Sequence, residues 1–325
     1  MICFYPRRAE LVGDFLLQGE LCMKEILKRL LKFYSSKEID ITEEYEKIRK
    51  FQGIISMNIE IEERNKDRIL PVGEGIRVRL FEPEKMESEE VICYFHGGGW
   101  VIGSIDYFAQ ACMNITKATA RRVISVDYRL APENPFPAGF DDCFNAVEAI
   151  LGGSMLKTSP EHLILMGDSA GGNIAAAISL KVRNLKKPLP KAQVLFYPVL
   201  YWDHSENSPF PSAIENGFDY GLTSKNVDEY YSLYVKKEED RKNPYAAPLM
   251  AEDFSNQPPT LIITSEFDPL RDEGEAYGER LRSAGGLVRV ERMKDAVHGF
   301  INFPWLFSAV KESLTIVREF LDGLN

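Results

Sequence analysis

The chain of 325 residues is 45% hydrophobic and 27% charged, which suits one large globular domain or a domain with a smaller lobe. Its formal net charge of −10 argues against nucleic acid or an anionic membrane as a partner, because both bind basic surfaces. No apolar run approaches the roughly 18 residues of a transmembrane helix, so we expect no membrane span. Glu10 and Asp14 argue against a signal peptide, which makes the cytoplasm the expected location.

The five cysteines are scattered and form no C-x-x-C pair, so the sequence predicts neither a disulfide framework nor a zinc site. Cys93 falls in an apolar run and Cys112 and Cys143 in helix-like runs, where a small buried side chain is expected. This pattern fits a reduced cytosol. We expect neither a metal nor a cofactor.

Two kinds of pattern occupy the first part of the chain. Residues 21–34 repeat apolar side chains with a helical period, which predicts an amphipathic helix packed on its own protein rather than on a membrane. Alternating apolar residues then predict two half-exposed edge strands, at residues 57–61 and 76–80.

Nearly continuous apolar runs follow, and these are typical of strands buried on both faces. They lie at residues 91–95, 123–128, 163–166, 193–199 and 260–264, with a further strand expected at 287–293. Helix-like stretches lie at residues 107–120, 140–150, 170–182, 273–284 and 306–321. Strands that alternate with helices predict a mostly parallel sheet with right-handed crossovers. The expected fold class is therefore α/β with about eight strands.

Residues 201–247 fit this alternation poorly, because they are rich in aromatic side chains and contain no run typical of a buried strand. We predict that residues 1–52 and 201–247 form a helical cap. The core then consists of residues 53–200 and residues 248–325.

The GDSAGG motif at residues 167–172 lies between an apolar run and an alanine-rich run. Ser169 is either a nucleophile or the polar residue of a tight turn. A nucleophile elbow needs this strand-to-helix context, because the sharp turn lifts the serine hydroxyl above the sheet. Glycines at 167 and 171 would avoid collisions with neighbouring elements. The motif alone leaves both interpretations open.

The HGGGW motif at residues 96–100 directly follows a predicted strand. α/β-Hydrolases place there a loop that donates backbone N–H groups to an oxyanion. The backbones of Gly97, Gly98 and Gly99, together with Ala170 after the serine, would provide such an oxyanion hole. A phosphate cradle is the alternative, but the sequence has no G-x-x-x-x-G-K-[ST] motif. His96 at the head of the loop is expected to make a structural hydrogen bond.

A nucleophilic serine needs a base, which in the α/β-hydrolase order comes after the serine and the acid. His298 fits this order, in a loop after the last predicted strand, whereas His96 precedes the serine. His162 precedes its strand instead. His204 lies in the predicted cap and could touch substrate, although a solvated surface residue is the preferred interpretation.

Three carboxylates compete to orient that base: Glu266, Asp268 and Asp272. Asp272 is expected to cap the next helix, and Glu266 lies close to the end of its strand. Asp268 precedes Pro269, which favours an extended, fixed turn, so Asp268 is preferred.

The order and content of five motifs resemble the hormone-sensitive-lipase-like branch of the α/β-hydrolases, which includes many bacterial carboxylesterases. The motifs are HGGGW (96–100), DYRLAPE (127–133), GDSAGGN (167–173), DPLRDE (268–273) and HGF (298–300). The resemblance implies an α/β-hydrolase fold with Ser169 as nucleophile, His298 as base and Asp268 as its orienting acid. It implies an oxyanion hole from residues 97–99 with Ala170. Arg129 and Glu133 are implied to brace the turn behind the glycine loop.

The expected reaction is ester hydrolysis through an acyl-enzyme, and the resemblance implies short- to medium-chain acyl groups, acetyl included. An amidase or formamidase with the same triad is the alternative, and a non-catalytic small-molecule receptor on this scaffold is a further one. The expected partners are a small ester and water. Trp100, Tyr201 and Trp202 are candidate pocket walls. The oligomeric state stays open, a homodimer included.

Overall fold

The computed structural model describes residues 39–62, 64–73, 75–304 and 308–324. Within these ranges the chain forms one eight-stranded sheet. The strands are β1 (Lys66–Leu70), β2 (Ile76–Phe81), β3 (Val91–Phe95), β4 (Arg122–Val126), β5 (Leu163–Asp168), β6 (Ala192–Phe196), β7 (Thr260–Phe267) and β8 (Val288–Val297). They lie in the order β1-β2-β4-β3-β5-β6-β7-β8. β1 and β2 pair antiparallel, and every pairing from β4 to β8 is parallel. The predicted mostly parallel α/β fold is confirmed.

The first strand differs from the prediction. Residues 57–61 form a turn and an irregular segment after the first described helix, and β1 begins later, at Lys66. Ile59 and Ile61 pack against the apolar core from this segment without a strand partner, which explains the alternation that suggested a strand. β1 exposes four of its five residues, so its sequence lacks the pattern of a buried strand.

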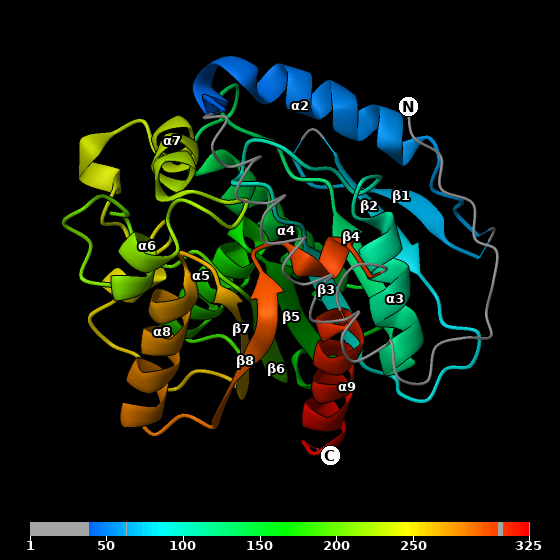
Figure 1. Cartoon of the computed structure of the whole chain (residues 1–325). Helices are drawn as coiled ribbons and strands as arrows, with labels where there is room; N and C mark the ends of the chain where they lie inside the picture. The colour runs from blue at the N-terminus through cyan, green and yellow to red at the C-terminus, as the bar shows by residue number, and fades with distance from the viewer. Residues whose placement is uncertain (1–38, 63, 74, 305–307, 325) are drawn as a thin grey trace, which may run out of the picture.

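Helices cover both faces of the sheet (Figure 1). They are α2 (Ile41–Ser56), α3 (Ala109–Thr119), α4 (Ala138–Leu151), α5 (Ala170–Asn184), α6 (Pro211–Glu215), α7 (Ser224–Tyr234), α8 (Arg271–Ser283) and α9 (Ala309–Asp322). α3 and α9 pack together on one face, whereas α4, α5 and α8 lie on the other. No described helix has the length and apolar character needed to cross a membrane. The amphipathic helix predicted at residues 21–34 lies outside the described residues.

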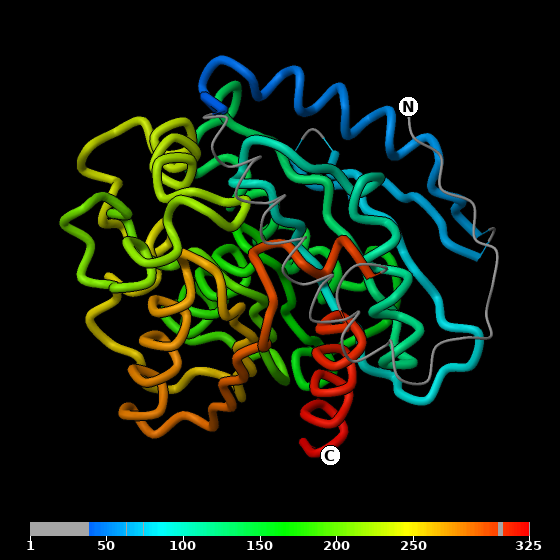
Figure 2. Tube along the Cα trace, viewed as in Figure 1, coloured from blue at the N-terminus to red at the C-terminus, as the bar shows by residue number. Residues whose placement is uncertain are grey.

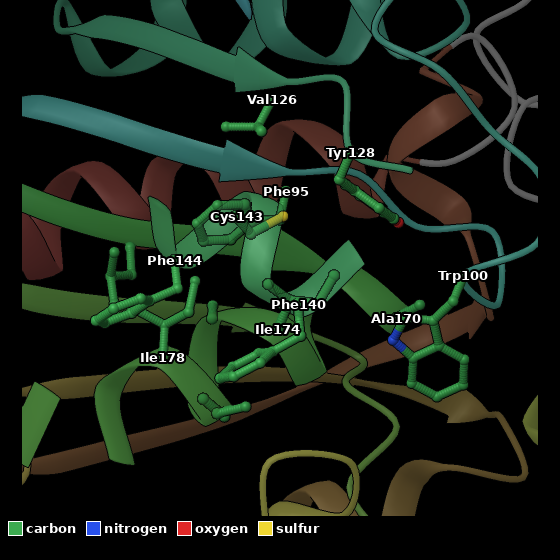
Figure 3. Close-up of a cluster of buried hydrophobic side chains, with 14 of the residues drawn as sticks. Phe95, Trp100, Val126, Tyr128, Phe140, Cys143, Phe144, Ala170, Ile174 and Ile178 are labelled. Atoms are coloured by element: carbon green, nitrogen blue, oxygen red, sulfur yellow. The ribbon is translucent and has the colours of Figure 1, made fainter. Parts of the chain in front are cut away.

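Side chains of each central strand alternate between two apolar clusters. In β3, Ile92 and Tyr94 enter the cluster under α3 and α9, and Cys93 and Phe95 enter the cluster under α4 and α5. Figure 3 shows the second cluster, where side chains of α4 and α5 meet. Cys93, Cys112 and Cys143 are buried free thiols, as the sequence predicted. Burial on both faces fixes the register of each strand relative to its neighbours, and so fixes where its carboxyl end lies.

Residues 201–247 contain α6 and α7; α7 lies beside α2, and α6 packs against α8 (Figure 2). Two hydrogen bonds join α7 to the start of α2. Asn226 donates its side-chain amide to the carbonyl oxygen of Ile39 at 2.8 Å, and the carboxylate of Glu229 accepts the N–H of Ile41 at 3.0 Å. Two segments far apart in the sequence therefore meet above the carboxyl edge of the sheet.

The fold predicts opposite effects on stability when two helical glycines are replaced by alanine. A methyl group at Gly171 in α5 would overlap the carbonyl oxygen of Phe95 in β3, so Gly171→Ala should lower the free energy of unfolding by about 3 kcal/mol. A methyl group at Gly53 in α2 meets nothing within 4 Å, so Gly53→Ala should raise stability by about 0.5–1 kcal/mol. Urea unfolding measures both changes. Equal midpoints for the two variants would contradict the close packing of α5 on β3.

Candidate active site

Three side chains meet at the carboxyl edge of the sheet. Ser169 follows β5, Asp268 follows β7 and His298 follows β8. Nε2 of His298 lies 2.9 Å from Oγ of Ser169, and Nδ1 of His298 lies 2.8 Å from Oδ2 of Asp268. Asp268 is fully buried, and the His298 side chain keeps 12% of its surface exposed. The structure thus brings the predicted serine, histidine and aspartate into one hydrogen-bonded chain that can move a proton from the serine to the imidazole.

The turn that carries Ser169 is strained and tightly held. Ser169 has a φ of +54°, a left-handed value that costs a serine on the order of 1–3 kcal/mol. Its N–H donates to the carbonyl oxygen of Phe196 at 2.9 Å, and its carbonyl oxygen accepts the N–H of Asn173 at 3.0 Å. A methyl group at Gly167 would overlap the backbone of Gly171. The glycines flanking the serine are therefore required by packing.

The geometry also separates the three candidate acids. Asp268 contacts His298, while its other oxygen, Oδ1, accepts the N–H of Leu270 at 2.9 Å. Glu266 instead accepts the N–H of Asp295 at 2.8 Å. Asp272 lies in the first turn of α8, where it accepts the N–H of Ser212 at 2.8 Å. Among these carboxylates, Asp268 is the one positioned against the imidazole.

The glycine loop after β3 is anchored by Asp168, the residue before the serine. Its Oδ1 accepts the N–H of Gly97 at 2.8 Å and the hydroxyl of Tyr94 at 2.6 Å. Burial raises the pKa of Asp168 to about 6, although the hydrogen bonds from Tyr94 and Gly97 act in the opposite direction. The Gly97 N–H is thus occupied by the carboxyl group of Asp168, so in this arrangement it does not point to an oxyanion beside the serine.

Gly98 and Gly99 line the cavity beside Ser169, and both have positive φ, at 112° and 59°. Side chains are excluded at both positions: a methyl group at Gly98 would meet the backbone of Ile102, and one at Gly99 would meet the ring of Tyr230. Ala170 is the first residue of α5, so its N–H has no acceptor within the helix. These three residues can supply N–H groups next to the serine.

The cavity above Ser169 has a volume of about 200 Å³. Its walls are largely apolar and include residues from α2, the glycine loop, the cap segment and the loop after β8, among them Gln52, Trp100, Ile102, Leu222, Val227, Tyr230 and Phe303. Across the described ranges, no group of three or more His, Cys, Asp or Glu side chains is arranged to hold a metal ion. The site offers a proton relay, backbone donors and an apolar recess.

A family model described as an alpha/beta hydrolase fold matches residues 92–302. The chain belongs to this family. An arylesterase from Saccharolobus solfataricus is 38% identical over 228 residues, which cover 70% of this chain and 73% of that protein. A hyperthermophilic esterase from the archaeon Pyrobaculum calidifontis superposes with a TM-score of 0.81 at 32% identity, covering 92% of this chain and 97% of that one.

A crystal structure of an esterase from the bacterial hormone-sensitive lipase family superposes with a TM-score of 0.78 at 26% identity, covering 92% of this chain and 97% of that one. The resemblance to this branch of the α/β-hydrolases, predicted from the five motifs, is therefore confirmed.

Of the three aromatic residues predicted to line the pocket, one lines the cavity beside the serine and two lie elsewhere. Trp100 lines the cavity and stacks on Tyr234 of α7, with ring centroids 4.3 Å apart. Tyr201 lines a different surface pocket with Phe210. Trp202 lies beside the cations of residues 241 and 242. Neither Tyr201 nor Trp202 is among the residues that line the cavity beside the serine, and Tyr201 instead shares its pocket with residues of α8.

His204 is not the solvated surface residue that the sequence suggested. It is buried, with Nε2 2.7 Å from Oε2 of Glu273, and its backbone N–H donates to Oδ1 of Asp228 at 3.1 Å. Glu273 is also buried and accepts the N–H of Leu200 at 2.5 Å. Burial lowers the pKa of His204, but the charge of Glu273 and the hydrogen bonds with Asp228 and Glu273 outweigh it and raise the pKa to about 9. His96 is buried, with Nδ1 2.8 Å from the carbonyl oxygen of Gly97.

The His204–Glu273 pair predicts a pH dependence of stability. The unfolded histidine titrates near pH 6.5, so between that value and about 9 the folded protein holds more protons. The free energy of unfolding should therefore fall as pH rises from about 6.5 through 9, with a contribution of up to about 1.4 kcal/mol per pH unit. Urea unfolding at several pH values measures this slope. His204→Gln should flatten it and His162→Gln should retain it; an unchanged slope in His204→Gln would refute the assignment.

Proposed function

We propose that this chain is a serine carboxylesterase that hydrolyses short- to medium-chain acyl esters, acetyl esters included, through an acyl-enzyme. The observation that carries the proposal is the hydrogen-bonded chain of Ser169, His298 and Asp268 at the floor of an apolar cavity. The esterase names of the related proteins support the same reaction class.

In the proposed mechanism, Nε2 of His298 takes the hydroxyl proton as Oγ of Ser169 attacks the ester carbonyl carbon. The carbonyl oxygen becomes an oxyanion that accepts hydrogen bonds from the N–H groups of Gly98, Gly99 and Ala170. The C–O bond to the alcohol then breaks, and the leaving alkoxide takes the proton from His298. The same imidazole next deprotonates a water molecule that attacks the acyl-enzyme, which releases the carboxylic acid and restores the serine hydroxyl.

Asp268 would hold the imidazole with Nδ1 protonated, so that Nε2 faces the serine as an acceptor. Its negative charge also stabilises the imidazolium that forms when the serine is deprotonated. Asp168 is proposed to act elsewhere: its hydrogen bond to Gly97 fixes the start of the oxyanion loop. The steps use only protein groups, substrate and water.

The size and lining of the cavity support a small, uncharged acyl group. Its volume of about 200 Å³ lies below the roughly 300–1,000 Å³ of sites for drug-sized ligands. The apolar walls from Ile102, Val227 and Tyr230 suit a hydrocarbon chain. A non-catalytic receptor role is disfavoured by the base seated 2.9 Å from the serine hydroxyl.

We also propose that residues 1–52 and 201–247 act as a cap on a core of residues 53–200 and 248–325, although residues 1–38 lie outside the described ranges. The hydrogen bonds between α2 and α7 support this division. The free thiols of Cys93, Cys112 and Cys143 support a reducing, cytoplasmic location. A homodimer stays a prediction.

Replacing the nucleophile gives the direct test. Ser169→Ala should lower kcat for p-nitrophenyl acetate by about 10⁴–10⁶-fold, because no other group can form the acyl-enzyme. Initial-rate kinetics measures the loss, and circular dichroism checks that the variant is folded. Ser154→Ala, at an exposed position that does not line the cavity, should keep wild-type activity. Near-wild-type activity of Ser169→Ala would refute the proposed function.

The cavity predicts a preference among acyl chains. For p-nitrophenyl esters from acetyl to decanoyl, kcat/KM should be highest for the short and medium chains and fall toward decanoyl, because a longer chain exceeds the enclosed volume. The matching amide, p-nitroacetanilide, should react more slowly than p-nitrophenyl acetate. Faster hydrolysis of the amide would favour the amidase alternative instead.

A further inference from the structure

Two polar side chains of α2 bind the backbone on which the glycine loop rests. Arg49 donates from Nε to the carbonyl oxygen of Val101 at 2.6 Å and from Nη2 to the carbonyl oxygen of Ala131 at 2.6 Å. Gln52 accepts the N–H of Gly103 on its Oε1 at 2.9 Å. These contacts join a helix near residue 50 to segments more than 50 positions later in the sequence.

The geometry of α2 explains why both side chains reach the loop. Arg49 and Gln52 are three residues apart and so lie on one face of the helix. The guanidinium of Arg49 lies 4.9 Å from the ring centre of Tyr45, which orients it. Its remaining donors form a two-point contact with Glu133, at 2.8 and 3.0 Å. One planar group thus holds four acceptor atoms on three residues, more than the three donors of a lysine ammonium can reach.

The acceptors of Arg49 control the turn that contains the proposed oxyanion donors. The N–H groups of Val101 and Ile102 both donate to the carbonyl oxygen of Gly98, at 3.1 and 2.9 Å. The N–H of Ala131 donates to the carbonyl oxygen of Trp100 at 2.9 Å. By binding Val101 and Ala131 together, Arg49 clamps the two backbone segments that flank Trp100.

Gln52 secures the other end of the same loop. Gly103 packs so closely that a methyl group there would lie 2.6 Å from the carbonyl oxygen of Gly97 and 2.7 Å from Nδ1 of His96. The hydrogen bond from Gly103 to Gln52 therefore fixes a residue packed against Gly97, whose N–H donates to Asp168. Gln52 also lines the cavity beside the serine.

We propose that Arg49 and Gln52 are positioning residues for the oxyanion hole, so that docking of α2 sets the direction of the Gly98 and Gly99 N–H groups. The proposal rests on the proposed esterase function. Loss of one oxyanion donor typically lowers kcat by 10²–10³-fold, and a displacement of about 1 Å has effects near 10²-fold. A loosened loop should therefore reduce the rate of the chemical step while substrate still enters the apolar cavity.

The test compares Arg49→Ala and Gln52→Ala with the wild type on p-nitrophenyl acetate. We expect kcat to fall by about 10–100-fold in each variant, with KM changed by less than about threefold. Lys50→Ala is the matched control, because it removes an exposed cation from the same helix and should keep wild-type kinetics.

Active-site titration separates positioning from folding. Inactivation with a p-nitrophenyl phosphonate releases one p-nitrophenol per competent serine. Positioning predicts a full release with a lower rate constant for inactivation, because the phosphonyl oxygen uses the same donors. A merely structural role predicts a smaller release with unchanged turnover per remaining site, and that result would overturn the proposal.

Conservative variants sharpen the result. Gln52→Glu keeps an acceptor for the Gly103 N–H and should recover most of the rate lost in Gln52→Ala. Arg49→Lys keeps the charge but not the planar array of guanidinium donors, so it should recover little of the rate lost in Arg49→Ala. Full recovery in Arg49→Lys, or wild-type kcat in both alanine variants while Ser169→Ala is inactive, would refute the positioning role alone. An active Ser169→Ala would instead refute the esterase mechanism on which it rests.

Discussion

The close approach of α5 to β3 is the constraint on which the site depends. The first turn of α5 lies against the carbonyl oxygen of Phe95, and a glycine at 171 is required because any side chain would overlap that oxygen. This contact brings the serine turn next to the loop that leaves β3. Asp168 then binds the N–H of Gly97 across the gap, while the strained backbone of Ser169 turns its hydroxyl toward His298. One turn thus supplies both the anchor of the glycine loop and the proposed nucleophile.

The buried carboxyl of Asp168 has a specific place in this arrangement. It lies next to the serine in sequence, yet its oxygen binds Tyr94 and Gly97 rather than His298. A buried carboxylate without donors would be costly, and these two hydrogen bonds offset that cost. The N–H that it occupies is lost to the oxyanion hole. The loop therefore needs further N–H groups beyond Gly97, which Gly98 and Gly99 can provide only because both adopt backbone conformations that favour glycine.

Local patterns in the sequence predicted the parts of the structure that depend on local chemistry. The buried strands, the serine turn and the order of serine, acid and base all follow from apolar runs and short motifs. Contacts between distant segments were not predictable in this way. Arg49 is one of several cations on an amphipathic helix, and nothing in its local sequence indicates that it binds Val101 and Ala131. His204 was misassigned for the same reason, because its partner Glu273 lies 69 positions away.

Residues outside the sheet form hydrogen bonds to both the loop that carries Asp268 and the glycine loop of the proposed active site. On the acid side, Ser212 donates its hydroxyl to the carbonyl oxygen of Pro269 at 2.9 Å, and Asn216 donates to the carbonyl oxygen of Asp268 at 3.3 Å. On the oxyanion side, α2 binds the glycine loop through Arg49. The carboxyl ends of parallel strands place the loops at one edge, but the loops themselves lack the ladder of hydrogen bonds that fixes a strand. The segments above the sheet provide these missing hydrogen bonds, so the segments that line the cavity also hold the loops that carry the proposed catalytic groups.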